Sequence, residues 1–430
     1  MPEGTAQFTP LPDSKPGQNN TTTNTIYGQP CIHNPIGLGL KKVGHFRRET
    51  TLFLIDYFYR NINYGHPASK WLPSNHPTSR CVPHNHIMFL KTHKTGGSTI
   101  VNILFRYGDS RNLTFALGAG HLAWPQRFHI SQVLPFYRKP NILCSHTVFN
   151  KKPLNWLFPR EFSKYVTIIR NPVDTFESLF NYYHMGTSLG LGDDPVVSLE
   201  KFLERPSSAI INARNPMMFD LGLNQKYFQS YTAVTKYINF LNKEFDLVMI
   251  MDYFDESLIL LKRLMCWEID DILHVKVNER LDKERASYLS DRVKDNIKLW
   301  NKADVLLFTY FNATFWRKIE MEGSEFYEDL SAFRKRRLKL QQTCFENGSG
   351  AVQRIYGRKD VKGYSTRNDL NSSLKFLCNR WIKTENSYLY ELGQKRSQKR
   401  QEDWNQIWKN RPGLMTLLVG TCQKICSMYP

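Results

Sequence analysis

The residues best suited to chemistry lie between positions 86 and 108, where cations, hydroxyls and glycines follow a short apolar run. The loop reads Lys91-Thr92-His93-Lys94-Thr95-Gly96-Gly97 and continues into Ser98 and Thr99. Glycines let a backbone approach a ligand closely, and the N–H groups and dipole of a helix N-terminus favour negative charge. Lys94 adds a mobile cation, and the hydroxyls add donors. The loop therefore predicts an anion site.

The elements that must position this loop are a strand before it and a helix after it. The apolar run Ile87–Leu90 predicts a buried parallel strand, and Ser98 or Thr99 is expected to start a helix. The helix carries an apolar stripe at helical spacing, and Gly108 is expected to end it. The stripe consists of Ile100, Ile103, Leu104 and Tyr107.

This loop differs from the phosphate loop of ATP- and GTP-binding proteins, in which a lysine follows the last glycine as GxxxxGK[ST]. Here Lys94 precedes the glycines, and no GK[ST] is present. The arrangement suits a nucleotide whose distal group is a sulfate on a 5′-phosphate. The alternative is an ordinary strand–helix turn with solvent-facing lysines.

A second anion site is predicted where an apolar run ends at Arg170. Pro172 is expected to fix the turn at the start of the next helix, which carries Ser178 and Tyr182 one turn apart. Arg170 and Ser178 can then converge on one phosphate, which the arginine contacts through two N–H groups. An Arg-x-Pro sequence alone is a weak signal, but it gains weight when paired with the first loop.

Further apolar runs of strand length predict a parallel sheet. They are Asn141–Cys144, Tyr165–Ile169 and Phe245–Met251, and helical patterns separate them. We therefore expect an α/β fold, a P-loop-like parallel sheet flanked by helices. Ligands of such sheets bind beyond the carboxyl ends of the strands. The loop, His146, Arg170 and Asp252 all follow such ends.

The motifs KTHKTGGST with IVNILFRYG, and IIRNPVDTFESLF, resemble the galactose-3-O-sulfotransferases. The resemblance runs from about His86 to the region of Trp316; family members usually carry a small or polar residue at one of the two glycine positions. It implies a sulfotransferase fold, the donor 3′-phosphoadenosine-5′-phosphosulfate (PAPS), and transfer to the 3-hydroxyl of galactose in galactosylceramide-like glycolipids or glycoprotein glycans. It also implies a Golgi enzyme with one N-terminal membrane anchor.

The resemblance assigns roles to the two sites. The 5′-phosphosulfate would lie against Lys91, Thr92, Lys94, Thr95, Gly96, Gly97, Ser98 and Thr99, and the 3′-phosphate against Arg170 and Ser178. Transfer needs an in-line donor, stabilisation of the leaving oxygen by Lys94 and the loop N–H groups, and a base for the sugar hydroxyl. His146 ranks first as the base, because it follows a strand beside the site, and related sulfotransferases place a histidine there. His93 ranks second, and His121, His129 and His184 stay open. This chemistry requires no metal.

Composition limits the partners and the compartment. The formal net charge is +19, which indicates an anionic partner. The eight cysteines contain no CxxC pair, so buried thiols or lumenal disulfides are favoured over a metal at Cys81, His84 and His86. No run of about 18 apolar residues and no signal peptide is visible. We expect membrane association from the family resemblance, and no nucleic-acid partner.

We expect four regions: a flexible stem (1–45), a connector (46–85), a sulfotransferase core (86–342) and a basic, helical C-terminal extension packed on the core (343–430). Within the extension, 343–373 has the composition of a linker. Three rival functions remain. They are a sulfotransferase for another glycan, such as a uronyl 2-hydroxyl, a P-loop kinase or NTPase, and a non-enzymatic polyanion-binding protein.

Overall fold

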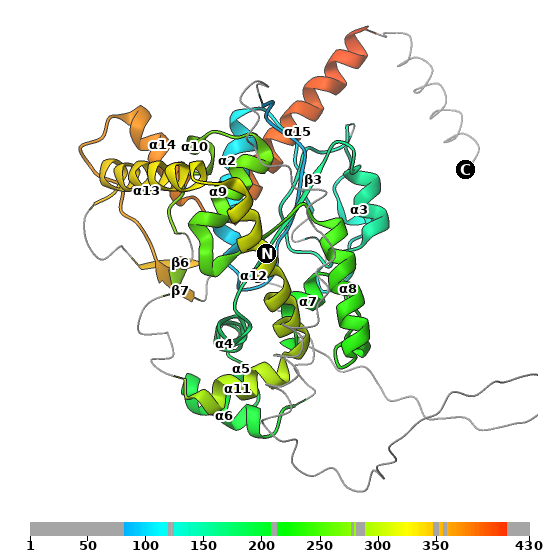
Figure 1. Ribbon diagram of the computed structural model, residues 1–430. Coiled ribbons are helices and arrows are strands. Elements are labelled where there is room, and N and C mark those ends of the chain that lie inside the picture. Colours follow the sequence, from blue (N-terminus) through cyan, green and yellow to red (C-terminus); the bar gives the residue numbers. More distant parts are fainter. Residues whose placement is uncertain are drawn as a thin grey trace, which may run out of the picture. The chain divides into compact units, whose positions relative to one another are not determined.

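The computed structural model describes residues 81–118, 122, 124–136, 138–207, 213–276, 279–280, 289–346, 352–355 and 359–410 (Figure 1). All belong to one of two compact units of the chain, Phe53–Pro430. The predicted stem and nearly all of the predicted connector lie outside the described residues. Among the described residues, no helix is both long and apolar enough to cross a membrane.

A four-stranded parallel sheet lies at the centre of the fold. It consists of β1 (Ile87–Leu90), β2 (Ile142–Leu143), β3 (Lys164–Ile169) and β4 (Leu247–Ile250), in the order β2-β1-β3-β4. Nearly every residue of these strands is buried. A parallel sheet covered on both faces requires such continuous apolar runs. The four predicted strands and the α/β class are confirmed.

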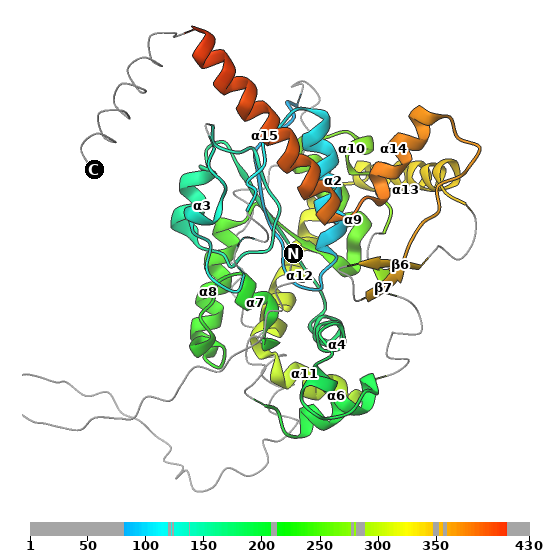
Figure 2. The same ribbon diagram turned by 180° about the vertical axis from the view of Figure 1, so that it is seen from behind.

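Helices cover both faces of this sheet. Figures 1 and 2 show α2 (Gly97–Ser110), α9 (Phe254–Met265) and α10 (Ile269–Ile272) on one side, and α3 (Lys151–Leu157) and α8 (Tyr231–Glu244) on the other. Further α-helices in the described part of the chain before residue 345 are α4 (Pro172–Tyr182), α5 (Met185–Ser188), α6 (Pro195–Glu204), α7 (Pro216–Asp220), α11 (Asp291–Trp300), α12 (Lys302–Glu322) and α13 (Glu325–Cys344). Helices α4, α6 and α11 enclose a second, smaller apolar core.

The strand order determines where a ligand can bind. From β1 the chain crosses to β2 on one side, and from β3 it crosses to β4 on the other. Ligands of open parallel sheets bind beyond the carboxyl ends of the strands at the point where the connections diverge. In this sheet that point lies between β1 and β3. The loop after β1 and Arg170 after β3 are the segments that it brings together.

One predicted helix boundary was wrong. Helix α2 continues past Gly108 to Ser110, and Gly108 is a packing residue: a Cβ there would lie 2.5 Å from the Phe115 ring. Asp255 lies inside the first turn of α9, whose N-cap is Tyr253, and it pairs with Arg334 and Arg337.

The basic helix α13 directs its arginines at acidic side chains. Arg334 reaches both Asp255 and Glu256, and Arg336 pairs with Asp270. These cations are therefore partly neutralised within the molecule. This arrangement counts against α13 as the polyanion-binding surface that the third rival function requires.

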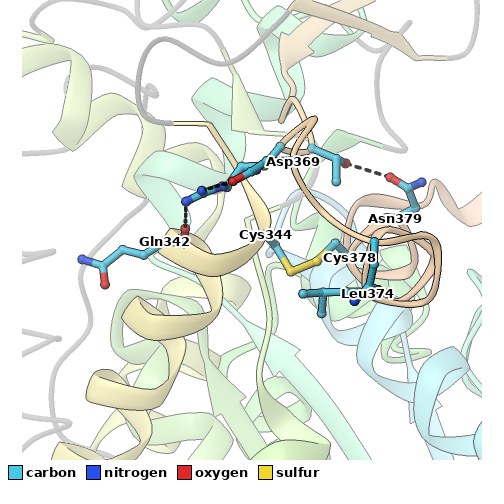
Figure 3. The surroundings of a disulfide bond; sticks show 9 residues. Gln342, Cys344, Asp369, Leu374, Cys378 and Asn379 are labelled. Carbon is cyan, nitrogen blue, oxygen red and sulfur yellow. Dashed lines mark hydrogen bonds and ion pairs between the residues drawn. A yellow bond between two sulfur atoms is a disulfide. The ribbon is translucent and has the colours of Figure 1, made fainter.

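The C-terminal part is more ordered than its composition indicates. The predicted linker 343–373 contains β6 (Val352–Ile355) and β7 (Lys359–Lys362), which form an antiparallel sheet with β5 (Glu279–Arg280). Two helices follow, α14 (Ser372–Ile382) and α15 (Glu385–Asn410). A disulfide joins Cys344, the last residue of α13, to Cys378 of α14 (Figure 3).

A buried histidine makes stability depend on pH. His274 is fully enclosed between the rings of Phe254 and Phe333, and burial lowers its pKa to about 3, with Arg337 acting in the same direction. Since the unfolded chain binds a proton below about pH 6.5 and the folded chain does not, stability should fall as pH drops from 6.5 toward 3. We expect a slope of roughly 1.4 kcal/mol per pH unit. Urea unfolding of wild type and His274→Phe at pH 7 and pH 5 tests this, and equal slopes in both proteins would contradict it.

Candidate active site

The loop after β1 adopts the backbone shape that an anion site needs. Lys94 and Gly96 have positive φ values of 60° and 78°, which turn the chain sharply before α2. Gly96 is the N-cap residue and has no side chain with which to cap the helix. The first turn of α2, all of it described, contains no acidic residue. The helix N-terminus is therefore available, in charge and in geometry, to an anion.

Two predicted ligands brace the loop instead of facing outward. The Thr92 hydroxyl donates to the Ile168 carbonyl of β3 and lies 2.8 Å from the Thr95 hydroxyl oxygen. Both threonines are fully buried, as is Thr99, whereas Ser98 is partly exposed. The side chains of Thr92 and Thr95 therefore fix the loop to the sheet, and only their backbone groups remain as candidate anion contacts.

Lys91, another predicted ligand, is paired with a residue from the C-terminal part of the chain. Its ammonium forms a buried ion pair with Glu385, with Nζ 2.5 Å from Oε2. Its aliphatic stem lies against Gly97, where an added Cβ would come within 2.8 Å of Lys91 Cγ. The close approach of the stem explains the second glycine of the motif. Lys91 therefore supports the loop through the packing of its stem against Gly97.

Arg170 lies against the loop, as the two-site prediction requires. Its guanidinium Nη1 donates to the Lys94 carbonyl over 3.3 Å. Helix α4 follows immediately, and the Lys94 ammonium lies 3.6 Å from the centre of the Tyr182 ring. Ser178 is buried one turn earlier on α4, so it lies on the helix side that approaches Lys94. Asp252 accepts from the Asn171 N–H at 2.9 Å, which places the end of β4 beside the same turn.

Two histidines and a carboxylate form a cluster beside the loop. The rings of His93 and His146 stack with centroids 4.1 Å apart, and the Trp124 ring packs against His93 at 4.4 Å. Asp220, the last residue of α7, accepts from both the backbone N–H and Nδ1 of His93, at 2.8 Å each. Its other oxygen accepts from Trp124 Nε1, also at 2.8 Å.

These contacts determine the tautomers of both neutral rings. His146 Nδ1 lies 3.1 Å from the Lys91 carbonyl, which can only accept, so Nδ1 carries the hydrogen. His93 Nδ1 faces a carboxylate and carries its hydrogen for the same reason. In both neutral rings the basic lone pair is therefore on Nε2. A carboxylate that holds Nδ1–H also stabilises the imidazolium that forms when Nε2 takes a proton.

The other candidate histidines lie in different surroundings. His129 is exposed and caps the short helix η2 (Ile130–Gln132), and His184 is exposed at the start of α5. His121 lies outside the described residues.

The metal site considered at Cys81, His84 and His86 lacks its cysteine ligand, because Cys81 is joined to Cys266 by a disulfide. Within the described ranges, no group of three or more His, Cys, Asp or Glu side chains is arranged to hold a metal ion.

Sequence reasoning missed Asp220 and Trp124 as partners of the site. Asp220 is 127 positions from His93 and stands in no recognisable motif. Trp124 contacts both Asp220 and His93. Only the tertiary fold brings these residues together.

The fold and site thus define an α/β protein with a glycine-containing turn at a helix N-terminus, an arginine beside it and a histidine pair with a carboxylate. The family model for galactose-3-O-sulfotransferase matches residues 58–396. Similar proteins include galactosylceramide sulfotransferase of Homo sapiens (34% identical over 337 residues, 72% of this chain and 78% of the relative) and galactose-3-O-sulfotransferase 2 of Sus scrofa (34% over 335, 71% and 83%). Galactose-3-O-sulfotransferase 3 of Mus musculus is 37% identical over 273 residues, 60% of this chain and 63% of the relative. The chain belongs to the galactose-3-O-sulfotransferase family and is an enzyme of that family.

Proposed function

We propose that this enzyme transfers the sulfuryl group of PAPS to the 3-hydroxyl of a galactose in a galactosylceramide-like glycolipid or a glycoprotein glycan. The observation that supports this most is the contact of Arg170 with the Lys94 carbonyl. It brings two anion-binding elements, from the ends of β1 and β3, close enough to hold opposite ends of one nucleotide. The relatives' printed names supply the galactose and its 3-position.

In this proposal the donor site uses fewer side chains than the sequence indicated. The N–H groups at Gly96–Ser98, the Ser98 hydroxyl and the Lys94 ammonium hold the 5′-phosphosulfate. Arg170 and Ser178 hold the 3′-phosphate. Lys91, Thr92 and Thr95 support the loop from beneath. Lys94 leaves the Tyr182 ring to reach the bridging oxygen, on which charge develops as the S–O bond breaks.

The acceptor hydroxyl loses its proton to the stacked pair formed by His93 and His146. The galactose oxygen forms a bond to sulfur, the bond from sulfur to the phosphate oxygen breaks, and the proton passes to an Nε2 of the pair. The two rings of the pair stack with their centroids 4.1 Å apart, so either Nε2 can be the proton acceptor. Asp220 stabilises the resulting positive charge as its counter-ion.

The proposal also covers the compartment. We propose a Golgi enzyme whose acceptor is presented at the membrane, as the family resemblance implies. The disulfides Cys81–Cys266 and Cys344–Cys378 suit an oxidising lumen.

A transfer assay tests the proposed function against its rivals. Labelled PAPS is offered with galactosylceramide, lactosides and heparan, and the position of the sulfate in each product is mapped. We expect label on the 3-hydroxyl of galactose. Label on heparan alone would favour the uronyl-type alternative. ATP binding without any response to 3′-phosphoadenosine-5′-phosphate (PAP) would favour a kinase, and salt-sensitive polyanion binding that survives Lys94→Ala, without transfer, would favour a binding protein.

A further inference from the structure

The C-terminal arm, defined as α14 and α15 (Ser372–Asn410), lies along the helix that follows the anion-binding loop. Figure 2 shows α15 passing beside α2. Asn102 of α2 donates to the carbonyls of Arg380 and Lys383, at 3.2 and 3.1 Å. The Phe105 ring packs on Tyr388 with centroids 5.2 Å apart. Asp109 pairs with Arg380 and Lys395. These three α2 residues recur every three or four positions, so one whole side of α2 faces the arm.

One side chain of the C-terminal arm, that of Glu385, contacts the loop after β1. Glu385, the first residue of α15, pairs with Lys91, and both side chains are at most 5% exposed. The pair joins positions 294 residues apart in sequence. The disulfide of Cys344 with Cys378 holds the preceding helix of the arm to α13 (Figure 3).

Lys91 is in contact with both halves of the candidate active site. Its backbone carbonyl accepts from His146 Nδ1, and its stem supports Gly97 at the start of α2. Its ammonium is fixed by Glu385. A displacement of Lys91 would therefore move the anion-binding turn and rotate the His146 ring together.

We infer that Glu385 is a positioning residue for the nucleotide site: by holding the Lys91 ammonium it fixes the loop from beneath and keeps Lys91 from acting as a phosphate ligand. This inference rests on the proposed function. It assigns the C-terminal arm, which the sequence presents only as a basic extension, a role in donor binding. It also gives Lys91 an indirect role in place of the direct contact that the sequence predicts.

Calorimetric titration of PAP into full-length variants tests this, at a temperature where thermal unfolding shows each to be folded. Glu385→Gln leaves the buried ammonium without its counter-charge, and we expect the dissociation constant to rise roughly tenfold. Glu385→Asp is a second variant that keeps the negative charge on a side chain one methylene shorter. It should fold even if Glu385→Gln does not, and it should weaken PAP binding severalfold. The matched control is Lys395→Met, which removes an exposed ion pair from the same helix and should leave PAP affinity unchanged.

The double variant Lys91→Met/Glu385→Leu separates positioning from direct contact. Methionine retains a stem against Gly97 and the carbonyl at His146, and no buried charge is left unpaired. We expect its PAP affinity to lie within about threefold of wild type. Affinity that stays low in the double variant would identify Lys91 as a phosphate ligand and overturn the inference. Wild-type affinity in both Glu385 variants would also overturn it, since a purely structural pair lowers only the melting temperature. Failure of the wild type itself to bind PAP would instead refute the proposed function.

Discussion

Replacing Lys94 with methionine is expected to reduce the turnover number for sulfate transfer by about 10²–10³-fold and to leave the fold intact. In the proposed mechanism this ammonium stabilises the oxygen on which the leaving nucleotide gains charge. In the structure it lies over the Tyr182 ring at 3.6 Å and is only partly buried. Methionine keeps much of the stem, so packing against α4 should survive.

The measurement is the rate of label transfer at saturating PAPS, together with thermal unfolding. Lys226→Met is a matched control, because Lys226 also lies over a tyrosine ring, that of Tyr227 at 4.9 Å, but on an exposed turn outside the site. It should transfer sulfate at the wild-type rate. A Lys94→Met enzyme that retains more than about a tenth of the wild-type turnover would show that the leaving oxygen is stabilised elsewhere.

Asp220→Asn is expected to lower the turnover number by about 10²–10⁴-fold. Both carboxylate oxygens accept N–H groups, one from Trp124 and the other from two donors of His93. An amide must turn its own NH₂ toward one of these donors, and it supplies no negative charge to the histidine pair. The loss should occur whichever ring of the pair receives the proton.

The pH profile of turnover in Asp220→Asn distinguishes this role from a purely structural one. Loss of the counter-charge should shift the acidic limb of the profile, because a histidine base acts only in its neutral form. Loss of packing alone should lower the amount of active enzyme without changing its profile. Asp246→Asn is the control: Asp246 binds Arg160 through both oxygens and accepts from the Tyr165 N–H, so it should affect stability alone. Full turnover in Asp220→Asn would remove Asp220 from the mechanism.

Local sequence determined much of the fold because its strands are buried on both sides. The runs around Phe89, Ile168 and Met249 contain almost nothing but apolar residues, and each was identified within about two residues at either end. The turn after β1 could also be predicted from local sequence, because a run of glycines and hydroxyl residues between a strand and a helix is typical of a turn at a helix N-terminus. The predicted end of α2 at Gly108 was wrong because the role of this glycine depends on tertiary contacts. The fold packs Phe115 and Ile142 against it.

The roles of charged side chains depended on distant partners and could not be predicted in the same way. Lys91 and Lys94 look alike in sequence, yet only Lys91 meets Glu385, which enters from the C-terminal arm. The contact of His93 with Asp220 could not be predicted either, because 127 positions separate the two residues. The Gly and Asn residues of 343–373 predict a linker, although part of that segment pairs with β5.

Binding of PAP and of 5′-AMP to wild type and Arg170→Ala, measured by calorimetry, tests the central claim most directly. The two ligands differ only by the 3′-phosphate that Arg170 is proposed to hold. We predict that PAP binds wild type much more tightly than 5′-AMP does, and that Arg170→Ala reduces PAP affinity to the level of 5′-AMP while 5′-AMP binding stays unchanged. Equal PAP affinity in wild type and Arg170→Ala would contradict the claim that one nucleotide spans the loop after β1 and the arginine after β3.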